Sequence, residues 1–575
     1  MSLATVAVIR LPVWRARFVL TLLVAAFLML IARSVYLQAM RTEFLQEKGE
    51  ARYARVLEVP ATRGRILDRK GEALAVSTPV KSIWAMPDAV SPEPAARAAL
   101  ARVLGMAPAD LERRIAGGEG RDFVYLKRQV PPEEAERVAA LGVPGVFQHK
   151  EFRRYYPGGE IAAHLVGFTG VDDVGQEGLE LAYQDSLGGK PGSRRVIKDR
   201  LGRVVEDIGS VRAGQDGRDL ILAIDAKIQS IAYGALKSAV ERHRARAGAV
   251  VVIDVLSGEV LALANAPSFN PNNRERLSAG QMRNRVLTDT FEPGSTMKPF
   301  TVALALENGK VRADSRVDTG NGRLTIANFT IQDTHPAASM TVTEVLQKSS
   351  NVGAARLALG LPAEAMWDLY RRVGLGEAPE LGFPGAAAGR VRHYRSWRPI
   401  EQATMSYGHG ISVSLMQLAR AYTVFARDGE LVPLTLTRAS GRVHGEKVFS
   451  AETARAVRAM LEAAVQTGAT GPRARAPGWR VAGKTGTAHK VIDGRYAADR
   501  YLSSFVGFAP VSAPRLVIAT MIDEPTAGGY YGGLVAAPVF SQVMQGALRL
   551  LGVPLDAPPV PIELPGENDD MREST

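Results

Sequence analysis

The chain has 575 residues, which is too long for one ordinary hydrophobic core and predicts two or more folded units. It contains no cysteine, so disulfides, thiolate metal sites and a cysteine nucleophile are excluded. The net charge of +12 fits either an anionic partner or an arginine-rich solvated surface, but no basic run alternates with aromatic residues as single-strand nucleic-acid binders require.

An uncharged apolar segment, residues 18–32, lies near the N-terminus, and basic residues flank it: Arg10, Arg15, Arg17 and Arg33. Residues 35–37 continue its apolar character, so residues 18–37 approach the length of about 20 that spans a bilayer. We expect one membrane anchor there and, because basic residues precede it, a cytoplasmic tail over residues 1–17. A cleaved signal peptide and a buried helix of a soluble protein are the alternatives.

The region after the anchor divides into two expected domains. Residues 38–56 are polar and predict a helical stalk, and the following stretch mixes short strand-like runs, turns and helical segments. A turn-rich stretch at residues 214–217 predicts a boundary, which gives an N-terminal domain over 38–215 and a second domain over 216–553. The proline-rich and acidic residues 554–575 predict a disordered tail.

The second domain has an α/β pattern. Ser257-Gly258 between two apolar runs predicts a hairpin, and Asn308-Gly309 predicts the end of a helix. The expected elements are hairpin strands at 249–255 and 260–264, a helix at 300–306, strands at 503–508 and 516–522, and a helix at 536–551.

A serine and a lysine three residues apart, Ser295 and Lys298, follow the helix-breaking pair Pro293-Gly294. If a helix begins at Ser295, both side chains share one face, and free N–H groups at its start can stabilise an oxyanion. Burial and the helix dipole would favour a neutral lysine that accepts the serine proton. The alternative is a helix-capping serine beside a solvated lysine.

Ser349 and Asn351 form a Ser-x-Asn motif, and Ser268 and Asn270 form a second copy. Serine and asparagine also favour helix N-caps, so the motif alone is weak. Only its position relative to other motifs distinguishes the two copies.

The third motif is Lys484-Thr485-Gly486-Thr487, in a stretch where small and β-branched residues alternate as in a strand. Its lysine and threonines could bind a carboxylate, and its glycine would let a substrate backbone approach closely. The alternative is a glycine-rich turn with a surface lysine.

Residues 478–485 also match the P-loop pattern, but neither a buried strand before the lysine nor a helix after it is expected, which argues against nucleotide binding. The eight histidines form no recognisable metal motif, so we expect no metal and no cofactor.

Ser-x-x-Lys, Ser-x-Asn and Lys-Thr-Gly in this order resemble the signature of the penicillin-recognising serine enzymes. Over nearly its whole length the chain resembles the class B penicillin-binding proteins, and most closely the division-specific, FtsI-like penicillin-binding protein 3. Five longer stretches also carry this likeness, one of which surrounds the Ser-x-Asn motif: Arg63–Gly71, Arg153–Gly158, Gly175–Glu180, Gln347–Gly353 and Tyr530–Pro538. The stretch Ala266–Pro271 also fits the family, which makes Ser268-x-Asn270 a decoy.

The resemblance implies an elongated pedestal domain on one transmembrane helix, followed by a transpeptidase domain with an antiparallel sheet between helical layers. It makes Ser295 the acylated nucleophile and Lys298 its base. Ser349 would relay protons, Asn351 would orient Lys298, and Lys484 would sustain a positive field and a hydrogen-bond chain to Ser349. The substrate-binding residues it implies are Thr485, Gly486, Thr487 and Tyr407, with the N–H groups of Ser295 and Thr487 as the oxyanion hole; His409 receives no catalytic role.

The family implies a peptidoglycan D,D-transpeptidase that cross-links stem peptides at the division septum and is acylated by β-lactam antibiotics. It also implies an inner-membrane anchor, a periplasmic catalytic domain, and a partner polymerase of the FtsW type with other divisome proteins. Nucleic acid is not an expected partner. The alternatives are an elongation-specific transpeptidase, a carboxypeptidase or β-lactamase, a β-lactam sensor, and a divisome scaffold with a vestigial site.

Overall fold

The computed structural model describes residues 13–40, 54–118, 120–121, 123–198, 204–492 and 494–558. Its contacts divide the chain into two compact units, which are described separately. The first unit comprises Met1–Ala61, Ser82–Lys150 and Lys190–Asp216, and the second comprises Thr62–Lys81, Glu151–Gly189 and Gly217–Thr575. Two strands contribute residues to both units: β3 (Ala73–Ala85) and β5 (Val146–Tyr155).

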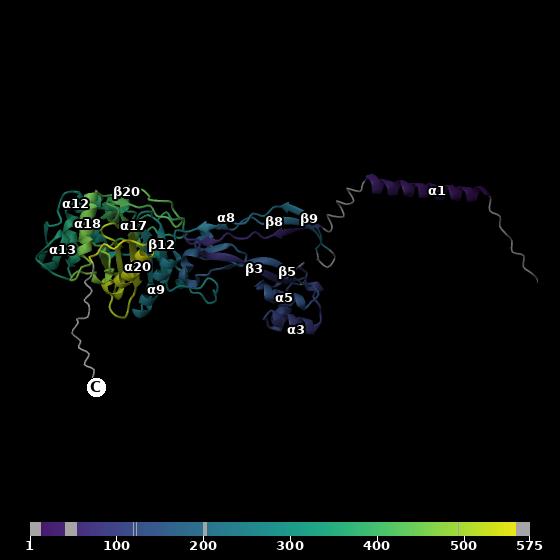
Figure 1. Ribbon diagram of the computed structural model, residues 1–575, viewed down its shortest axis with the longest axis horizontal. Coiled ribbons are helices and arrows are strands. Elements are labelled where there is room, and N and C mark those ends of the chain that lie inside the picture. Colours follow the sequence, from purple (N-terminus) through teal and green to yellow (C-terminus); the bar gives the residue numbers. More distant parts are fainter. Residues whose placement is uncertain are drawn as a thin grey trace, which may run out of the picture. The chain divides into compact units, whose positions relative to one another are not determined.

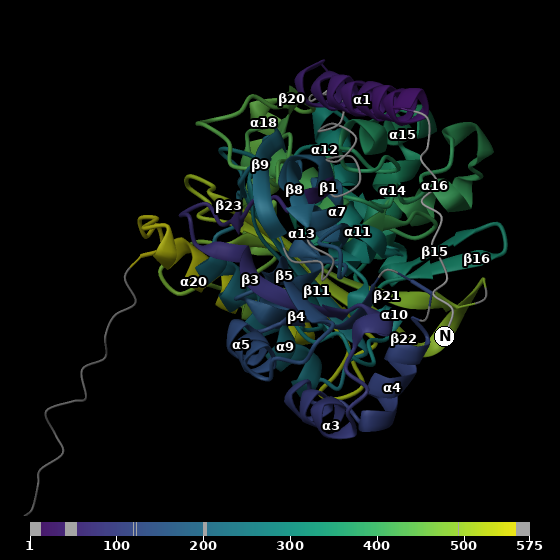
Figure 2. The ribbon, with the colours of Figure 1, turned by 90° about the vertical axis from the view of Figure 1, so that its right-hand side faces the viewer.

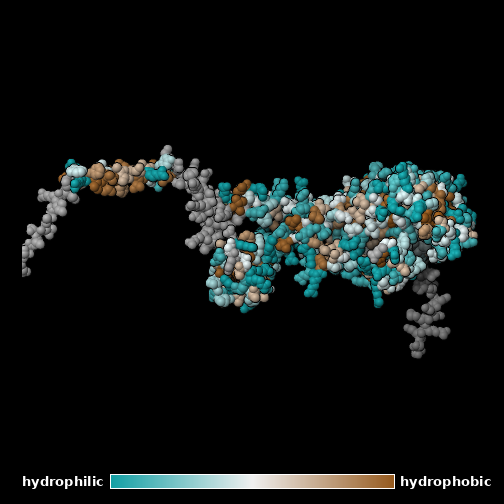
Figure 3. All heavy atoms as spheres, turned by 180° about the vertical axis from the view of Figure 1, so that it is seen from behind, coloured by the Kyte–Doolittle hydropathy of each residue, from teal (hydrophilic) through white to brown (hydrophobic). Residues whose placement is uncertain are grey.

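Helix α1 (Val13–Val35) is apolar, has no buried residue, and is long enough to cross a membrane by length and composition. Figure 3 shows apolar side chains along its middle and hydrophilic ones at both ends. It overlaps residues 18–37, where the anchor is predicted, and runs into the π-helical turn Tyr36–Met40. Residues 1–12 of the predicted cytoplasmic tail and residues 41–53 of the predicted stalk lie outside the described residues.

The last residues of the predicted helical stalk form a strand instead, so that prediction was wrong there. Strand β1 (Ala54–Val59) pairs antiparallel with β8 (Gly192–Lys198), which pairs with β9 (Val204–Arg212). Its pairing partner lies more than a hundred residues away in the sequence. Local helix propensity cannot report such a partner, and strand formation depends on it.

The first unit also contains a small helical core. Helices α3 (Pro94–Val103), α4 (Pro108–Ala116) and α5 (Pro132–Ala140) each begin with a proline, the residue whose fixed φ and missing N–H suit a first helical position. They pack with strand β4 (Val124–Val130) around buried aliphatic side chains: Ile83, Leu100, Leu111 and Leu126.

A five-stranded antiparallel sheet forms the centre of the second unit, in the order β12-β11-β23-β22-β21. Figure 1 shows its edge strand β12 among the helices of this unit. The strands are β11 (Ala247–Asp254), β12 (Val260–Ala266), β21 (Ala482–Ile492), β22 (Arg495–Ala509) and β23 (Leu516–Asp523). Every residue of β11 and β12 is buried, because helices cover both faces of the sheet. The predicted hairpin and both late strands are confirmed, although β22 is longer than expected.

Successive side chains of β11 enter opposite helical layers, as the period of a strand requires. Val250 and Val252 pack in one core with α9 (Ala226–Arg242) and α20 (Ala537–Leu550). Val251 packs in the other, with α12 (Lys298–Glu307), α13 (Val342–Gln347), α14 (Asn351–Leu359), α17 (Leu415–Ala426) and α18 (Ala451–Ala463). The predicted fold, an antiparallel sheet between helical layers, is confirmed.

The remaining elements of the second unit are short. Strands β15 (Arg323–Ile326) and β16 (Phe329–Gln332) form a separate hairpin (Figure 2). The others are α6 (Ala163–Val166), α7 (Gly178–Ala182), α8 (Gln184–Leu187), α10 (Ala279–Met282), α11 (Arg285–Thr288), α15 (Ala363–Arg372), α16 (Pro399–Met405), α19 (Gly532–Val535), β2 (Ile66–Leu67), β6 (Phe168–Thr169), β7 (Gly175–Glu177), β10 (Leu220–Ile221), β13 (Thr290–Phe291), β14 (Arg316–Asp318), β17 (Ser339–Thr341), β18 (Val413–Ser414), β19 (Glu430–Leu431) and β20 (Glu446–Lys447).

Three stretches singled out in the N-terminal part of the sequence converge on one buried carboxylate. Glu180 accepts a hydrogen bond from Arg63 Nε at 2.6 Å and another from Arg154 Nε at 2.7 Å. All three side chains are almost completely buried. These three side chains belong to segments that pack within the second unit. The predicted domain boundary at residues 214–217 remains a prediction.

Candidate active site

The serine of the first motif lies in a tight turn that leads into a helix. Residues Gly294–Met297 form a 3₁₀ turn, and α12 begins at Lys298 rather than at Ser295, so the expected helix start is three residues early. The hydroxyl of buried Tyr422, on α17, donates to the Thr296 carbonyl at 2.7 Å. The layer formed by α17 therefore fixes the turn that carries Ser295.

The buried amine of Lys298 joins the first two motifs. Its Nζ lies 2.7 Å from Ser295 Oγ, 2.8 Å from Asn351 Oδ1, and 2.7 and 3.0 Å from the carbonyl oxygen and Oγ of Ser349. A neutral amine has two N–H groups, which can donate to the two carbonyl-type oxygens of Ser349 and Asn351. Its lone pair then remains to accept the proton of a serine hydroxyl.

The environment of Lys298 favours this neutral form. Burial lowers the pKa of Lys298 well below its ordinary value, and the nearby charge of Lys484 lowers it further. Asp333 acts in the opposite direction but does not outweigh them. Lys298 is therefore suited to accept a proton from Ser295 at neutral pH.

Asp333 was missed by the sequence reasoning, yet it holds the second motif in place. Its carboxylate accepts hydrogen bonds from Ser350 Oγ at 2.5 Å, Asn351 N at 2.6 Å and Val352 N at 2.9 Å. It thus caps the start of α14, where an anion is favourable. Next to this cap, Ser349 has φ of 61°, a left-handed conformation that a serine adopts only when its surroundings impose it.

The third motif lies on β21, at the edge of the sheet. Lys484 is 1% exposed, and burial lowers its pKa to about 7. Its Nζ lies 3.3 Å from Thr485 Oγ1. Within the described chain it forms no direct hydrogen bond to Ser349, so its influence on Lys298 is electrostatic rather than through the expected hydrogen-bond chain.

Close backbone contacts place β21 against the nucleophile turn. A Cβ atom added at Gly486 would lie 2.9 Å from the Pro293 carbonyl oxygen, and one at Gly294 would lie 3.3 Å from that of Thr487. The Oγ1 of Thr487 accepts the N–H of Gly532 at 3.1 Å. An edge strand offers unpaired backbone groups to an extended peptide, so β21 can bind a substrate alongside Ser295.

Tyr407 is buried beside the same lysine, with its ring 6.0 Å from Lys298 Nζ. The loop that follows it abuts the nucleophile turn, because a Cβ at Gly408 would lie 2.3 Å from the Gly294 carbonyl oxygen. The structure therefore brings together the sequence-predicted residues of all three motifs and Tyr407.

The second Ser-x-Asn copy and the P-loop-like pattern at residues 478–485 have other structural roles. Ser268 Oγ donates to the Glu160 carbonyl at 2.7 Å, and the backbone of Asn270 pairs with that of Asn273. Lys484 of the P-loop-like pattern lies inside β21 rather than at the start of a helix, so the fold lacks the geometry of a phosphate-binding loop there. Among the residues that the structure describes, no cluster of three side chains could hold a metal ion.

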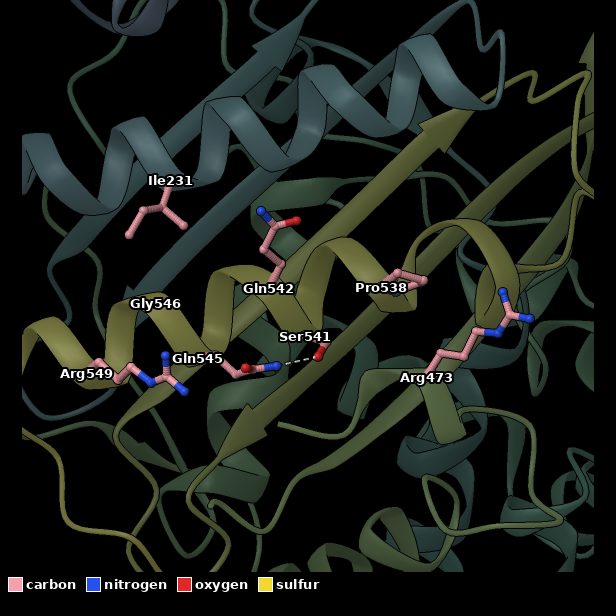
Figure 4. Close-up of a pocket in the computed structure, with 8 residues that line it drawn as sticks. All are labelled: Ile231, Arg473, Pro538, Ser541, Gln542, Gln545, Gly546 and Arg549. Carbon is pink, nitrogen blue, oxygen red and sulfur yellow. Dashed lines mark hydrogen bonds between the residues drawn. The ribbon is translucent and has the colours of Figure 1, made fainter. Parts of the chain in front are cut away.

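A cavity of about 440 Å³ lies elsewhere, along α9 and α20 (Figure 4). None of its lining residues belongs to the three motifs. They are Ile231, Arg473, Pro538, Ser541, Gln542, Gln545, Gly546 and Arg549. The cavity is therefore not part of the candidate active site.

Two family models match the chain. The penicillin binding protein transpeptidase domain matches residues 248–545, and the penicillin-binding protein dimerisation domain matches residues 58–222. The chain belongs to the class B penicillin-binding proteins. The three motifs of this penicillin-binding protein all fall inside the transpeptidase match.

Curated relatives extend the likeness over almost the whole penicillin-binding protein. The chain is 45% identical to the probable peptidoglycan D,D-transpeptidase PenA of Neisseria gonorrhoeae, over 94% of this chain and 93% of PenA. It is 43% identical to the peptidoglycan D,D-transpeptidase FtsI of Escherichia coli, over 95% and 93%. Among solved structures, the transpeptidase domain of Burkholderia pseudomallei penicillin-binding protein 3 is 51% identical with a TM-score of 0.55, over 59% of this chain and 98% of that one.

Proposed function

We propose that this penicillin-binding protein is a peptidoglycan D,D-transpeptidase of septal wall synthesis that works through an acyl-serine intermediate. The observation that carries the proposal is the 2.7 Å contact between Ser295 Oγ and the Nζ of a buried lysine whose pKa is lowered. The names of the relatives PenA and FtsI support the same activity.

Ser295 Oγ attacks the carbonyl of the penultimate D-alanine of a donor stem peptide, and its proton passes to Lys298. The tetrahedral oxyanion is stabilised by the N–H groups of Ser295 and Thr487; losing one such donor costs about 3–4 kcal/mol of barrier. The C–N bond then breaks, the proton moves through Ser349 to the leaving D-alanine, and an acyl ester of Ser295 remains.

Lys484, Thr485 and Thr487 bind the donor carboxylate, with Gly486 allowing close approach and Tyr407 lining the cleft. Asn351 orients Lys298 and binds the substrate amide. In the second half of the reaction an amine from a neighbouring stem peptide attacks the ester, forms the cross-link and returns the proton to Ser295. β-Lactams acylate the same serine but are not displaced by the acceptor.

Helix α1 anchors the enzyme in the inner membrane, with residues 1–17 in the cytoplasm and the rest in the periplasm. Residues 38–215 serve as the pedestal, residues 216–553 carry the transpeptidase, and residues 554–575 follow as a tail. An FtsW-type glycosyltransferase supplies the glycan strands, and it should co-purify with the full-length chain in detergent.

Mass spectrometry of the full-length protein after penicillin treatment tests the proposal. We expect one adduct, on the peptide that contains Ser295, and no adduct on Ser295→Ala. Covalent labelling of Ser295→Ala would refute the mechanism. A fluorescent fusion at midcell would support the septal role, whereas a fusion along the side wall would favour elongation.

A further inference from the structure

The carboxylate of Glu292 lies in the segment that leads into the nucleophile turn, three residues before Ser295. It accepts the N–H of Gly410 at 2.8 Å and the hydroxyl of Tyr496 at 3.1 Å. Gly410 ends the loop that begins at Tyr407, and Tyr496 lies on β22. Glu292 is thus held where the nucleophile turn, this loop and the β21–β22 hairpin meet.

This carboxylate lacks a cationic partner in the described part of the chain. Both of its hydrogen-bond donors are neutral groups, and among the described residues no lysine, arginine or histidine forms an ion pair with it. The ring of His409 lies 6.0 Å from that of Tyr496, but burial lowers the pKa of His409 to about 4, so it is uncharged at neutral pH. Burial also raises the pKa of Glu292, which shows that its charge is poorly solvated.

In the centre of the cleft, by comparison, the described residues give neither Lys298 nor Lys484 an ion-paired carboxylate, and both lysines are buried. An acceptor amine reaches this cleft as an ammonium ion at neutral pH, because primary amines have pKa values near 10. Lys484 repels it when protonated, and neutral Lys298 offers it no negative charge. Beside Glu292, by contrast, an ammonium meets a negative charge and the aromatic ring of Tyr496, a ring type that attracts cations.

We propose that Glu292 binds the ammonium group of the acceptor substrate before that amine attacks the acyl ester on Ser295. The inference rests on the transpeptidase function proposed above and extends it from the donor to the acceptor. The occupant is a primary amine on a flexible chain, and Glu292 selects it by charge.

The proton transfers of the attack on the acyl ester are consistent with this role of Glu292. The bound ammonium gives one proton to solvent, and the free amine attacks the ester carbonyl of acyl-Ser295. As the C–N bond forms and the C–O bond to Ser295 breaks, a second proton passes through Lys298 to Ser295 Oγ. Glu292 forms no covalent bond and is unchanged at the end.

Two nucleophiles separate binding of the ammonium from the rest of the reaction: propylamine, which is charged at neutral pH, and hydroxylamine, which is not. Full-length enzyme in detergent is acylated by a thioester analogue of an acyl-D-alanine donor, and the amide and hydrolysis products are measured. For Glu292→Gln we expect the use of propylamine relative to water to fall about ten- to a hundred-fold, the value of a hydrogen bond to a charged group. Use of hydroxylamine and acylation by penicillin should stay within about twofold of the wild type.

Three further variants test whether Glu292 has only a structural role. Glu364→Gln removes an exposed carboxylate that likewise accepts a tyrosine hydroxyl, from Tyr394 at 2.8 Å, and should change nothing. Tyr496→Phe removes the hydroxyl but keeps the charge of Glu292, and should keep the preference for propylamine. Glu292→Asp should restore part of that preference.

Equal losses with propylamine and hydroxylamine in Glu292→Gln would overturn the inference. The same loss in Tyr496→Phe would overturn it too, because the carboxylate would then act only by holding the hairpin. Failure of the proposed function looks different: the wild-type enzyme itself would not be acylated on Ser295.

Discussion

Two places in the second unit bury a pair of basic side chains, and they do so in opposite ways. Arg63 and Arg154 share the carboxylate of Glu180. Lys298 and Lys484 are equally buried, but within the described chain neither forms an ion pair. A buried cation either keeps a counter-ion and its charge, or loses its proton.

The residue types match these two solutions. Arginine cannot be deprotonated in a protein, so burying it demands a carboxylate, and its planar fork binds one with defined geometry. Lysine changes its pKa readily when buried, which allows it to act as a base. The arginine centre (Arg63, Arg154 and Glu180) therefore joins three chain segments, whereas the lysine centre (Lys298 and Lys484) is suited to move protons.

The strongest test of the comparison replaces Lys298 by arginine. Lys298→Arg stays charged and leaves Ser295 without a base, so the rate of acylation by penicillin should fall about 10³-fold. Stopped-flow measurement with a fluorescent penicillin gives the rate. Lys348→Arg, an exposed lysine that donates to the Gly468 carbonyl, should acylate normally; an active Lys298→Arg enzyme would contradict the assignment of the base.

The converse change removes the counter-ion of the arginines. Glu180→Gln leaves two buried guanidinium groups without a carboxylate, and the free energy of unfolding should fall by about 3–5 kcal/mol. Urea unfolding of the full-length protein measures it, with exposed Glu177→Gln as the control. Acylation by the folded fraction should not change. If Glu180→Gln instead unfolded like the wild type but acylated slowly, the two centres would not differ as described.

The pH dependence of acylation distinguishes the two lysines. Lys298 must be neutral, which favours high pH, whereas Lys484 must be charged to attract a carboxylate, which favours low pH. Because the pKa of Lys484 is about 7, the wild-type rate should decline as the pH rises above that value, by about fifty-fold between pH 7 and pH 9. In Lys484→Arg the charge persists and the decline should disappear. The control Lys490→Arg, at a lysine of the same strand that pairs with Asp523 and Glu524, should retain the decline. An unchanged decline in Lys484→Arg would assign it to another group.

The smallest expected effect concerns Asp333, whose carboxylate holds Asn351 beside Lys298. Asp333→Asn keeps the shape of the cap on α14 but weakens its hydrogen bonds, and should cost about 1 kcal/mol of stability. Because Asp333 raises the pKa of Lys298, its removal should not impair the base, and acylation should slow only a few-fold through misplacement of Asn351. Thermal unfolding and acylation rates, compared with exposed Asp314→Asn, measure both. A loss as large as that of Lys298→Arg would give Asp333 a direct part in proton transfer.

The apolar N-terminal segment, the α/β pattern and the three motifs in order are all local features, and the sequence was sufficient to predict them. The apolar segment is helical because its residues bond within a few positions of one another. The strands at 249–255 and 260–264 were recognisable because adjacent strands need only a turn between them. Even the decoy at 478–485 could be rejected from its immediate neighbours.

Only the tertiary structure decided which distant residues support this chemistry. Asp333 lies 18 residues before the helix that it caps, and Tyr496 lies 204 residues after the carboxylate that it contacts. The left-handed backbone of Ser349 and the strand at Ala54–Val59 likewise depend on distant partners. Hydrogen bonds and burial act through space, so a pKa, a cap or a strand pairing is fixed only when segments remote in sequence pack together.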